Sequence, residues 1–70
     1  MERYLNLGGD SNVYGYEIGP DSISVQFIGT AKIYTYSHRK AGIAHVNNMK
    51  GLASAGRGLN SYINRHVKHA

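Results

Sequence analysis

The spacing of apolar residues changes near His38, and this change constrains the fold more than any other feature of the chain. Before it, three segments alternate apolar and polar side chains, as half-buried strands do. These segments are residues 13–18, 23–28 and 32–37. Turn-forming residues separate them, at 19–22 and at 29–31. Because short strands joined by tight turns pair with their neighbours, the sequence predicts a three-stranded antiparallel meander.

The same alternation predicts which side chains share a face of the sheet. In the first strand it sets Tyr14, Tyr16 and Ile18 against Val13, Gly15 and Glu17. The second strand has the clearest one-sided pattern, with Ile23, Val25 and Phe27 opposite Ser24 and Gln26. In the third strand Tyr34 and Tyr36 lie on one face, and Ile33 and Thr35 lie on the other.

After His38 the apolar side chains recur at intervals of three and four, which is typical of amphipathic helices. A first helix is expected from Arg39 or Lys40 to about Ala53, with a stripe of Ile43, Val46, Met49 or Lys50, and Ala53, broadened by Leu52. A second helix is expected around the stripe Leu59, Tyr62, Ile63, His66 and Val67. The predicted fold class is therefore α+β, in the order β-β-β-α-α, with both helices packed on one face of the sheet.

The length of 70 residues limits the chain to one domain, which we expect to span residues 13–70. Turn formers at 8–12 indicate that residues 1–12 are a flexible N-terminal lead-in. The chain has no Cys, which excludes a disulfide scaffold, a thiolate nucleophile and a zinc site built on thiolates, and no cofactor is expected. No segment has the apolar run of a signal peptide or a membrane span, so we expect a cytoplasmic protein without a membrane partner.

Charge is distributed unevenly along the chain. All four acidic residues lie within the first 21 positions, whereas basic residues continue to the end and give a net charge of +4. This asymmetry favours a polyanionic partner, and the residues expected to form a basic face on the helical half are Arg39, Lys40, Arg57, Arg65 and Lys68. The alternative is that these charges only keep a small domain soluble.

Several short motifs occur in a characteristic order over about 50 residues. They are Ser11, Gly15-Tyr16, Val25-Gln26-Phe27 with Gly29, Tyr34-Thr35-Tyr36, Ser54-Ala55-Gly56, Asn60 and Ile63. In this order the chain resembles the KTSC domain, a short domain named after the C-terminus of certain lysyl-tRNA synthetases that also occurs as a free-standing bacterial or phage protein. The chain departs from the pattern in the longer link 30–33 and in Leu59, where an aromatic residue is commoner. The resemblance implies no assigned activity, and it suggests RNA binding only through the synthetase context.

Two groups of residues are candidate contacts for nucleic acid. Lys32, Tyr34 and Tyr36 lie at intervals of two on the third predicted strand, and on an exposed face they would stack bases and hold a phosphate. If the tyrosines instead face the helices, they fill the core, and the two arrangements differ by one residue of register. The second group is a phosphate-binding turn before the last helix, comprising Ser54, Gly56, Arg57, Gly58 and Asn60, for which the alternative is a plain interhelical turn.

Catalytic and metal sites find little support in the sequence. His66 and His69 are three residues apart, but no acidic residue or Cys follows Asp21 to complete a set of metal ligands. No paired carboxylates and no nucleophile with its base are apparent, so we expect neither an enzyme nor a small-molecule substrate. The sequence therefore predicts a non-catalytic module that binds RNA, either single-stranded or transfer RNA. The alternative is a protein-interaction or homodimerisation module that uses an exposed sheet edge or face.

Overall fold

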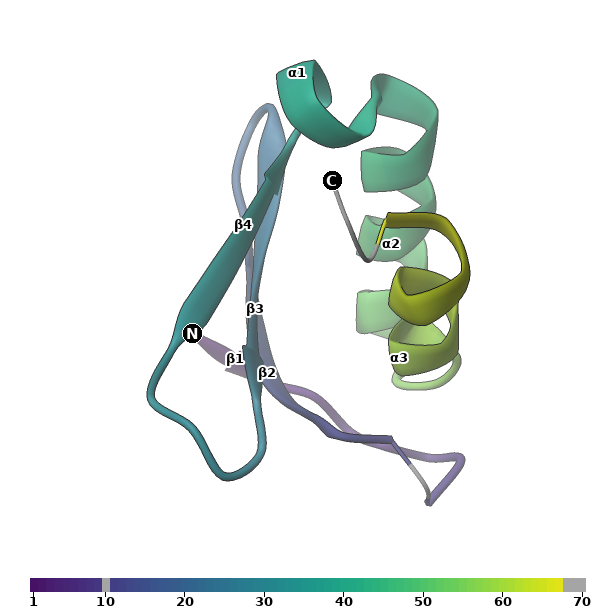
Figure 1. Ribbon diagram of the computed structural model, residues 1–70. Helices are drawn as coiled ribbons and strands as arrows, with labels where there is room; N and C mark the ends of the chain where they lie inside the picture. Colours follow the sequence, from purple (N-terminus) through teal and green to yellow (C-terminus); the bar gives the residue numbers. More distant parts are fainter. Residues whose placement is uncertain (10, 68–70) are drawn as a thin grey trace.

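A computed structural model describes residues 1–9 and 11–67 of the chain. Along the sequence it contains a sheet followed by helices (Figure 1). The strands are β1 (Glu2–Arg3), β2 (Val13–Ile18), β3 (Ser22–Phe27) and β4 (Ile33–Ser37). The helices are α1 (His38–Ala41), α2 (Ile43–Ala55), α3 (Leu59–Tyr62) and the π-helical turn η1 (Ile63–Val67). The α+β class is confirmed, and the antiparallel sheet is larger than the predicted meander.

The additional strand comes from the segment that was expected to be a lead-in. The strand order is β1-β2-β3-β4, and β1 pairs with β2 through Glu2 opposite Tyr16 and Arg3 opposite Gly15. Tyr4, which follows β1, is buried, and its hydroxyl accepts a hydrogen bond from the Leu59 N–H at 3.3 Å. Glu2, Arg3 and Tyr4 thus pair or pack with the domain, although they lie in the segment that was expected to be a lead-in. Two-residue strands carry almost no periodic signal, which is why β1 was missed.

A β-bulge in β2 changes which side chains face the helices. Val13 is opposite Phe27, and Gly15 is opposite Gln26, so Tyr14 is the extra residue on this strand. As a result Val13 is buried beside the core, whereas Tyr14 is largely exposed. The predicted grouping of Tyr14 with Tyr16 was therefore wrong, because simple alternation does not continue through a bulge.

The first predicted helix is divided at Gly42. This glycine has φ +96°, a backbone conformation that other residues rarely adopt, so α1 ends and α2 begins in a new direction. Ser37 caps α1, and its hydroxyl accepts a hydrogen bond from the Lys40 N–H. Of the predicted stripe, Val46, Met49 and Ala53 are buried, as expected. Ile43 is exposed, since it starts α2 just after the break.

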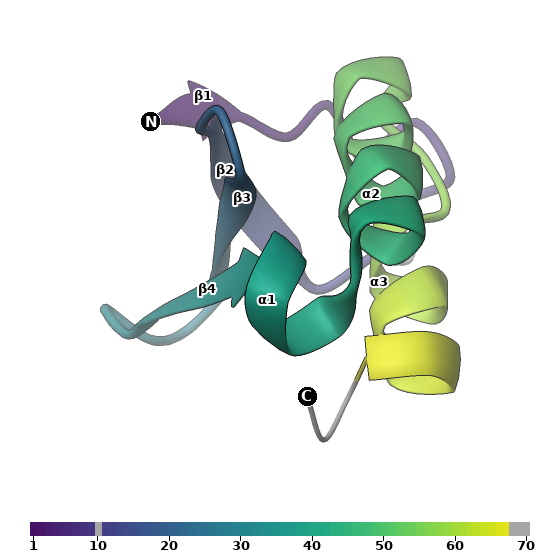
Figure 2. The same cartoon turned by 90° about the horizontal axis from the view of Figure 1, so that it is seen from above.

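The second predicted helix is formed by α3 and η1 together. Leu59, Ile63 and Val67 are buried and four residues apart, which matches the predicted stripe. Tyr62 is only partly buried and His66 is exposed, so these two side chains form the outer border of the helix. The helices lie on one face of the sheet, as expected, and no described segment covers the other face (Figure 2).

The core lies between these two layers. It combines Ile23 and Val25 from β3 with Val46 and Met49 from α2, all of which are fully buried. Lys50 also links the layers, because its ammonium donates a hydrogen bond to the carbonyl of Gly19 at 2.8 Å. Among the described residues, no helix has the length and apolar character that crossing a membrane requires.

Candidate nucleic-acid interface

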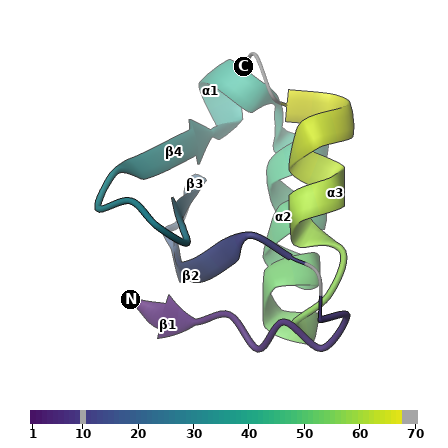
Figure 3. The same ribbon diagram turned by 60° about the horizontal axis from the view of Figure 1, so that its bottom comes forward.

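The pairing of β4 with β3 settles the orientation of the two tyrosines. Tyr36 is opposite Ile23 and Tyr34 is opposite Val25, so both rings lie on the face that carries the helices. Of the two arrangements left open by the sequence, the structure has the one in which the rings face inward. Tyr36 is only 8% exposed, but Tyr34 is 41% exposed. The difference arises because β4 ends beside α1, whereas its first residues lie farther from the helix layer (Figures 2 and 3).

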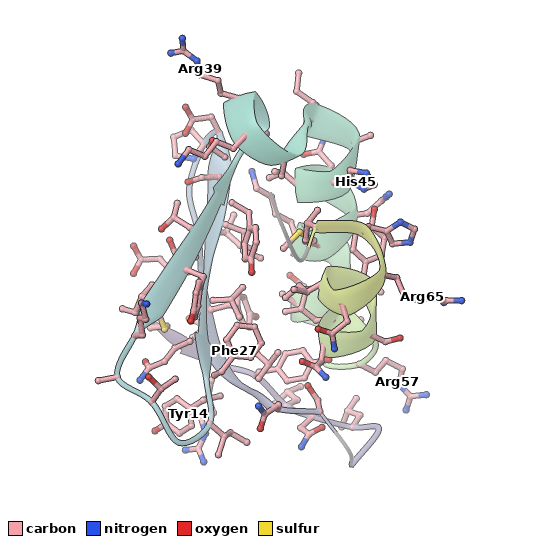
Figure 4. The ribbon with its side chains drawn as sticks, viewed as in Figure 1. Tyr14, Phe27, Arg39, His45, Arg57 and Arg65 are labelled. Carbon is pink, nitrogen blue, oxygen red and sulfur yellow. The ribbon has the colours of Figure 1, made fainter. Side chains whose placement is uncertain are left out.

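Tyr34 lines a cleft of about 330 Å³ between the sheet and η1. Phe27 meets it edge to face, with the two ring centroids 5.6 Å apart and the planes at 71°. Figure 4 shows Phe27 reaching from the sheet toward the helices. The full lining comprises Asn12, Phe27, Ile28, Thr30, Tyr34, Tyr36, Ile63 and Asn64. Aromatic walls and amide groups therefore share one solvent-open cavity.

A positive charge lies over one of these aromatic rings. The ammonium of Lys32 is 5.6 Å from the centroid of the Tyr34 ring, within the range of a cation–π contact. The loop that carries Lys32 is held by Thr30, whose hydroxyl accepts from the Lys32 N–H and whose carbonyl accepts from the Gln26 amide, each at 3.1 Å. The predicted neighbours Lys32 and Tyr34 are thus in contact.

Tyr36 lines the same cleft from a more buried position. Burial raises the pKa of the Tyr36 phenol above 10.0, and the nearby Tyr34 phenol raises it further. Both causes act in the same direction, because each disfavours the phenolate. The Tyr36 hydroxyl is therefore kept protonated to a higher pH than an exposed tyrosine.

The basic residues of the helical half do not converge. Figure 4 shows Arg39 pointing away from the α1 end, whereas Arg57 and Arg65 point outward from the helix layer. Lys40 lies on α1 next to Arg39. Lys68 lies outside the described residues. The five residues predicted to form one basic face are thus, as far as the structure describes them, distributed over separate parts of the surface.

The turn predicted to bind phosphate connects α2 to α3. Gly56 adopts a left-handed conformation as the C-cap of α2, and its N–H donates to the carbonyls of Leu52 and Ala53. Gly58 is the N-cap of the four-residue α3, and the next N–H, that of Leu59, donates to Tyr4. Ser54 lies within α2 and Asn60 within α3, and the exposed Arg57 lies between the two glycines. This geometry is that of the interhelical turn, with two of its N–H groups already bonded, and phosphate binding there stays a prediction.

A second polar cluster joins α2 to α3 on the outer side of the helix layer. The Tyr62 hydroxyl lies 2.6 Å from Nδ1 of His45, and it accepts a hydrogen bond from the Asn48 amide at 3.1 Å. The His66 ring is tilted against the Tyr62 ring, with centroids 4.4 Å apart. Within residues 1–9 and 11–67, no three potential metal ligands come together. His69, the other histidine considered for such a site, lies outside the described residues.

The outer face of the sheet carries a second contact between a cation and a tyrosine. The guanidinium carbon of Arg3 is 4.6 Å from the centroid of the Tyr14 ring. Tyr14 is 44% exposed, nearly the same fraction as Tyr34, but it lines none of the described cavities. Each pair places a cation over a tyrosine ring, and the pair on the helix-facing side lies at a cleft among those described.

The sequence did not identify the residues that make Tyr34 part of a cavity. Phe27 was predicted to share a face of its strand with Ile23 and Val25, but its place in this cleft depends on how the sheet and the helices are placed relative to each other. Asn12 and Asn64 are far apart in the sequence and meet only across this cleft. No local spacing pattern could have joined them.

Comparison of the chain with family models, with curated proteins and with solved structures finds no match. The resemblance to the KTSC domain stays a prediction.

Proposed function

We propose that this protein is a non-catalytic module that binds single-stranded RNA in the cleft between β4 and η1. The observation that carries the proposal is the position of the Lys32 ammonium over Tyr34, at a cleft of about 330 Å³. This volume is at the lower end of the range of about 300–1,000 Å³ for small-molecule sites, so it suits one nucleotide better than a large ligand. A cation beside an accessible aromatic ring matches the two parts of a nucleotide, phosphate and base.

A base would enter the cleft by stacking on Tyr34. The ring is accessible because it is 41% exposed, and Phe27 holds it from the side in an edge-to-face contact. Stacking of a base on an aromatic side chain contributes about 1–3 kcal/mol and tolerates any sequence. The amides of Asn12 and Asn64 supply donors and acceptors for the edge of the base or for a ribose hydroxyl.

Lys32 would then hold the phosphate of the same nucleotide. A base that stacks on Tyr34 displaces the ammonium from the ring, and the flexible lysine side chain keeps its charge nearby. The more distant arginines contribute only to the net charge of +4, which attracts a polyanion over a longer range. Each phosphate contact with a single strand contributes about 0.7 to the slope of log K against log salt concentration. A small site therefore has a shallow salt dependence.

The described lining of the cleft contains hydroxyl and amide groups, with no carboxylate, imidazole or thiol. General acid–base chemistry at neutral pH relies mainly on imidazole, carboxylate and thiol groups. This composition favours binding over catalysis.

The proposal can be tested by fluorescence anisotropy with a labelled single-stranded RNA of mixed sequence, at low and at physiological salt. We expect saturable binding that Tyr34→Ala weakens by about 5- to 150-fold, the equivalent of about 1–3 kcal/mol. The matched control is Tyr14→Ala, which removes an equally exposed tyrosine beside a cation on the opposite face. The control should bind RNA like the parent protein.

Further variants separate local phosphate contact from general charge. Lys32→Ala should reduce the salt slope by about 0.7, whereas charge reversal at Arg57 and Arg65 should lower the affinity without changing the effect of Tyr34→Ala. An equal loss in the Tyr34 and Tyr14 variants would contradict the assignment to the cleft. Absence of binding to RNA at low salt would overturn the function itself. Equal affinity for single-stranded DNA would show that the ribose hydroxyl is not recognised.

A further inference from the structure

The two outer edges of the sheet differ in length and protection. At one edge β1 is only two residues long, and at the other β4 presents five residues. Within β4 there is no proline and no charged residue, and its pairing with β3 runs without a bulge. Proteins commonly block an open edge with one of these devices, because an unpaired strand is a template for another chain. Ile33 and Tyr34 also remain substantially exposed on this edge.

The hydrogen-bonding pattern shows which backbone groups of β4 are free. Opposite residues of an antiparallel pair alternate between exchanging their N–H···O bonds and exchanging none. The His38 N–H donates to the Asp21 carbonyl at 2.8 Å, and this bond sets the phase of the alternation. Tyr34 and Tyr36 therefore direct their N–H groups toward β3. The N–H groups that point to the open edge are those of Ile33, Thr35 and Ser37.

We propose that β4 pairs antiparallel with β4 of a second copy of this chain, about a two-fold axis through Thr35. In this register, each residue whose backbone N–H points to the open edge lies opposite another such residue. Thr35 pairs with Thr35 of the second copy, and Ile33 pairs with Ser37. On the helix-facing side Tyr34 then lies opposite Tyr36 of the second copy, which extends the row of aromatic rings across the interface. Aromatic pairs opposite each other in this way stabilise neighbouring strands.

Several observations favour a second copy over an unrelated peptide. The sequence Tyr-Thr-Tyr at 34–36 is symmetric about its centre, so a two-fold axis matches like residues with like. The strand is also limited in length, since α1 begins at His38 directly after it. Finally, a filament would require β4 of one copy to pair with β1 of the next, and β1 is only two residues long. Pairing of β4 with β4 instead closes into a dimer.

Charge gives this dimer a characteristic salt dependence. In the proposed register Lys32 lies opposite His38 of the second copy and next to its Arg39, and each copy has a net charge of +4. The positive charges of Lys32 and Arg39 are thus brought together at both ends of the paired strands. Salt screens such repulsion, so the dimer should become tighter as the salt concentration rises. RNA binding in the cleft should become weaker over the same range. The two properties can therefore be measured separately.

The experiment is sedimentation equilibrium of the protein over a range of concentrations up to about 1 mM, at low and at high salt, without nucleic acid. We expect the mass to rise from 7.7 kDa toward twice that value, at lower protein concentration when the salt is high. Thr35→Pro removes the central outward N–H and should return the protein to monomer. Ile33→Lys adds a charge to the edge and should also prevent the dimer. Unlike Thr35→Pro, it keeps the hydrogen bond of 2.9 Å between the Ser24 and Thr35 hydroxyls, so it controls for loss of folding.

A constant mass of 7.7 kDa at every concentration and salt would overturn the proposal. So would a dimer that persists in both folded variants, because it would use another surface. Circular dichroism establishes that each variant is folded. Neither result depends on RNA binding, since the sedimentation is measured without nucleic acid.

Discussion

The two edges of this small sheet meet the helices in different ways. At the β1 edge, Tyr4 is buried and accepts a hydrogen bond from Leu59, and the Leu7 N–H donates to the Gly56 carbonyl at 2.7 Å. At the β4 edge, Tyr34 is exposed and borders a cleft. Figure 3 shows the chain after β1 passing beside the helices, whereas β4 extends away from them.

This difference suggests a division of roles within one domain. A chain of 70 residues buries little surface in total, so each contact between the layers contributes a large share of its stability. The β1 edge, called the closed edge below, is tied to the helices by the hydrogen bonds of Tyr4 and Leu7. The β4 edge, called the open edge below, leaves part of the Tyr34 ring exposed. Exposed aromatic area costs stability and is common at binding sites. We therefore expect substitutions at the closed edge to affect folding, and substitutions at the open edge to affect binding.

The largest effect is expected from Leu59→Ala at the closed edge. Leu59 is fully buried where α3 begins, and its truncation removes apolar contacts and leaves a cavity. Such substitutions cost about 2–5 kcal/mol in the free energy of unfolding. The matched change at the open edge, Tyr34→Ala, should cost about 1–2 kcal/mol, because the ring is 41% exposed and loses mainly its edge-to-face contact with Phe27. Urea unfolding monitored by circular dichroism measures both, and equal losses would break the comparison.

A second test uses two glycines of the helical half. Gly56 has φ +79°, and an added Cβ would lie 2.8 Å from the Leu5 Cβ, so Gly56→Ala should destabilise the protein by about 2–3 kcal/mol. Gly51 lies inside α2, and an added Cβ would meet open space. Gly51→Ala should therefore stabilise the protein by up to about 1 kcal/mol, because alanine favours helix. A shift of the urea midpoint in the same direction for both variants would contradict this assignment.

Removing single hydroxyl groups gives a smaller contrast. Tyr4→Phe leaves the buried Leu59 N–H without its acceptor, and we expect a loss of about 1–2 kcal/mol in unfolding free energy. Tyr34→Phe should change stability by less than about 0.5 kcal/mol, since Tyr34 is 41% exposed, whereas Tyr4 is buried. Both variants preserve the ring, so thermal unfolding compares the hydroxyls alone. A neutral Tyr4→Phe variant would mean that the closed edge does not depend on this bond.

The smallest effect concerns alkaline pH. The pKa of Tyr36 is raised by burial in the folded protein, so the unfolded chain loses this proton first as the pH rises. The contribution of Tyr36 to the free energy of unfolding is therefore fully present below pH 10.0. It is lost as the pH rises from there through the folded-state pKa. We expect the unfolding free energy of the parent protein to fall more steeply above pH 10.0 than that of Tyr36→Phe. Tyrosinate absorbance and urea unfolding at matched pH values measure this, and parallel curves would argue against it.

Much of the fold could be predicted from local patterns. The alternation at Ile23, Val25 and Phe27 correctly assigned the inner face of β3, and the spacing of Leu59, Ile63 and Val67 correctly assigned the buried side of the last helix. In both places one face is buried and the period continues without interruption. Where the backbone departs from its period, at the bulge near Tyr14 and at the break at Gly42, the predictions failed.

The candidate site depended more strongly on tertiary structure. The sequence identified Lys32, Tyr34 and Tyr36 because they follow a period of two on one strand. It left their orientation open, since one residue of register moves them from one face to the other. It also placed the arginines of the helical half on one face, although helix direction and the turn at Gly56 separate them in space.

The sequence by itself determined that the strands precede the helices, the α+β class and most of the buried side chains, because periodicity and turn chemistry act over a few residues. Only the tertiary structure decided that residues 1–4 complete the sheet and that Tyr34 opens into a cleft with Phe27 and Asn64. It also decided that β1, and not β2, forms the other edge of the sheet. These properties depend on how the layers meet and on which strand is outermost, and both are set by contacts between residues that are distant in the chain.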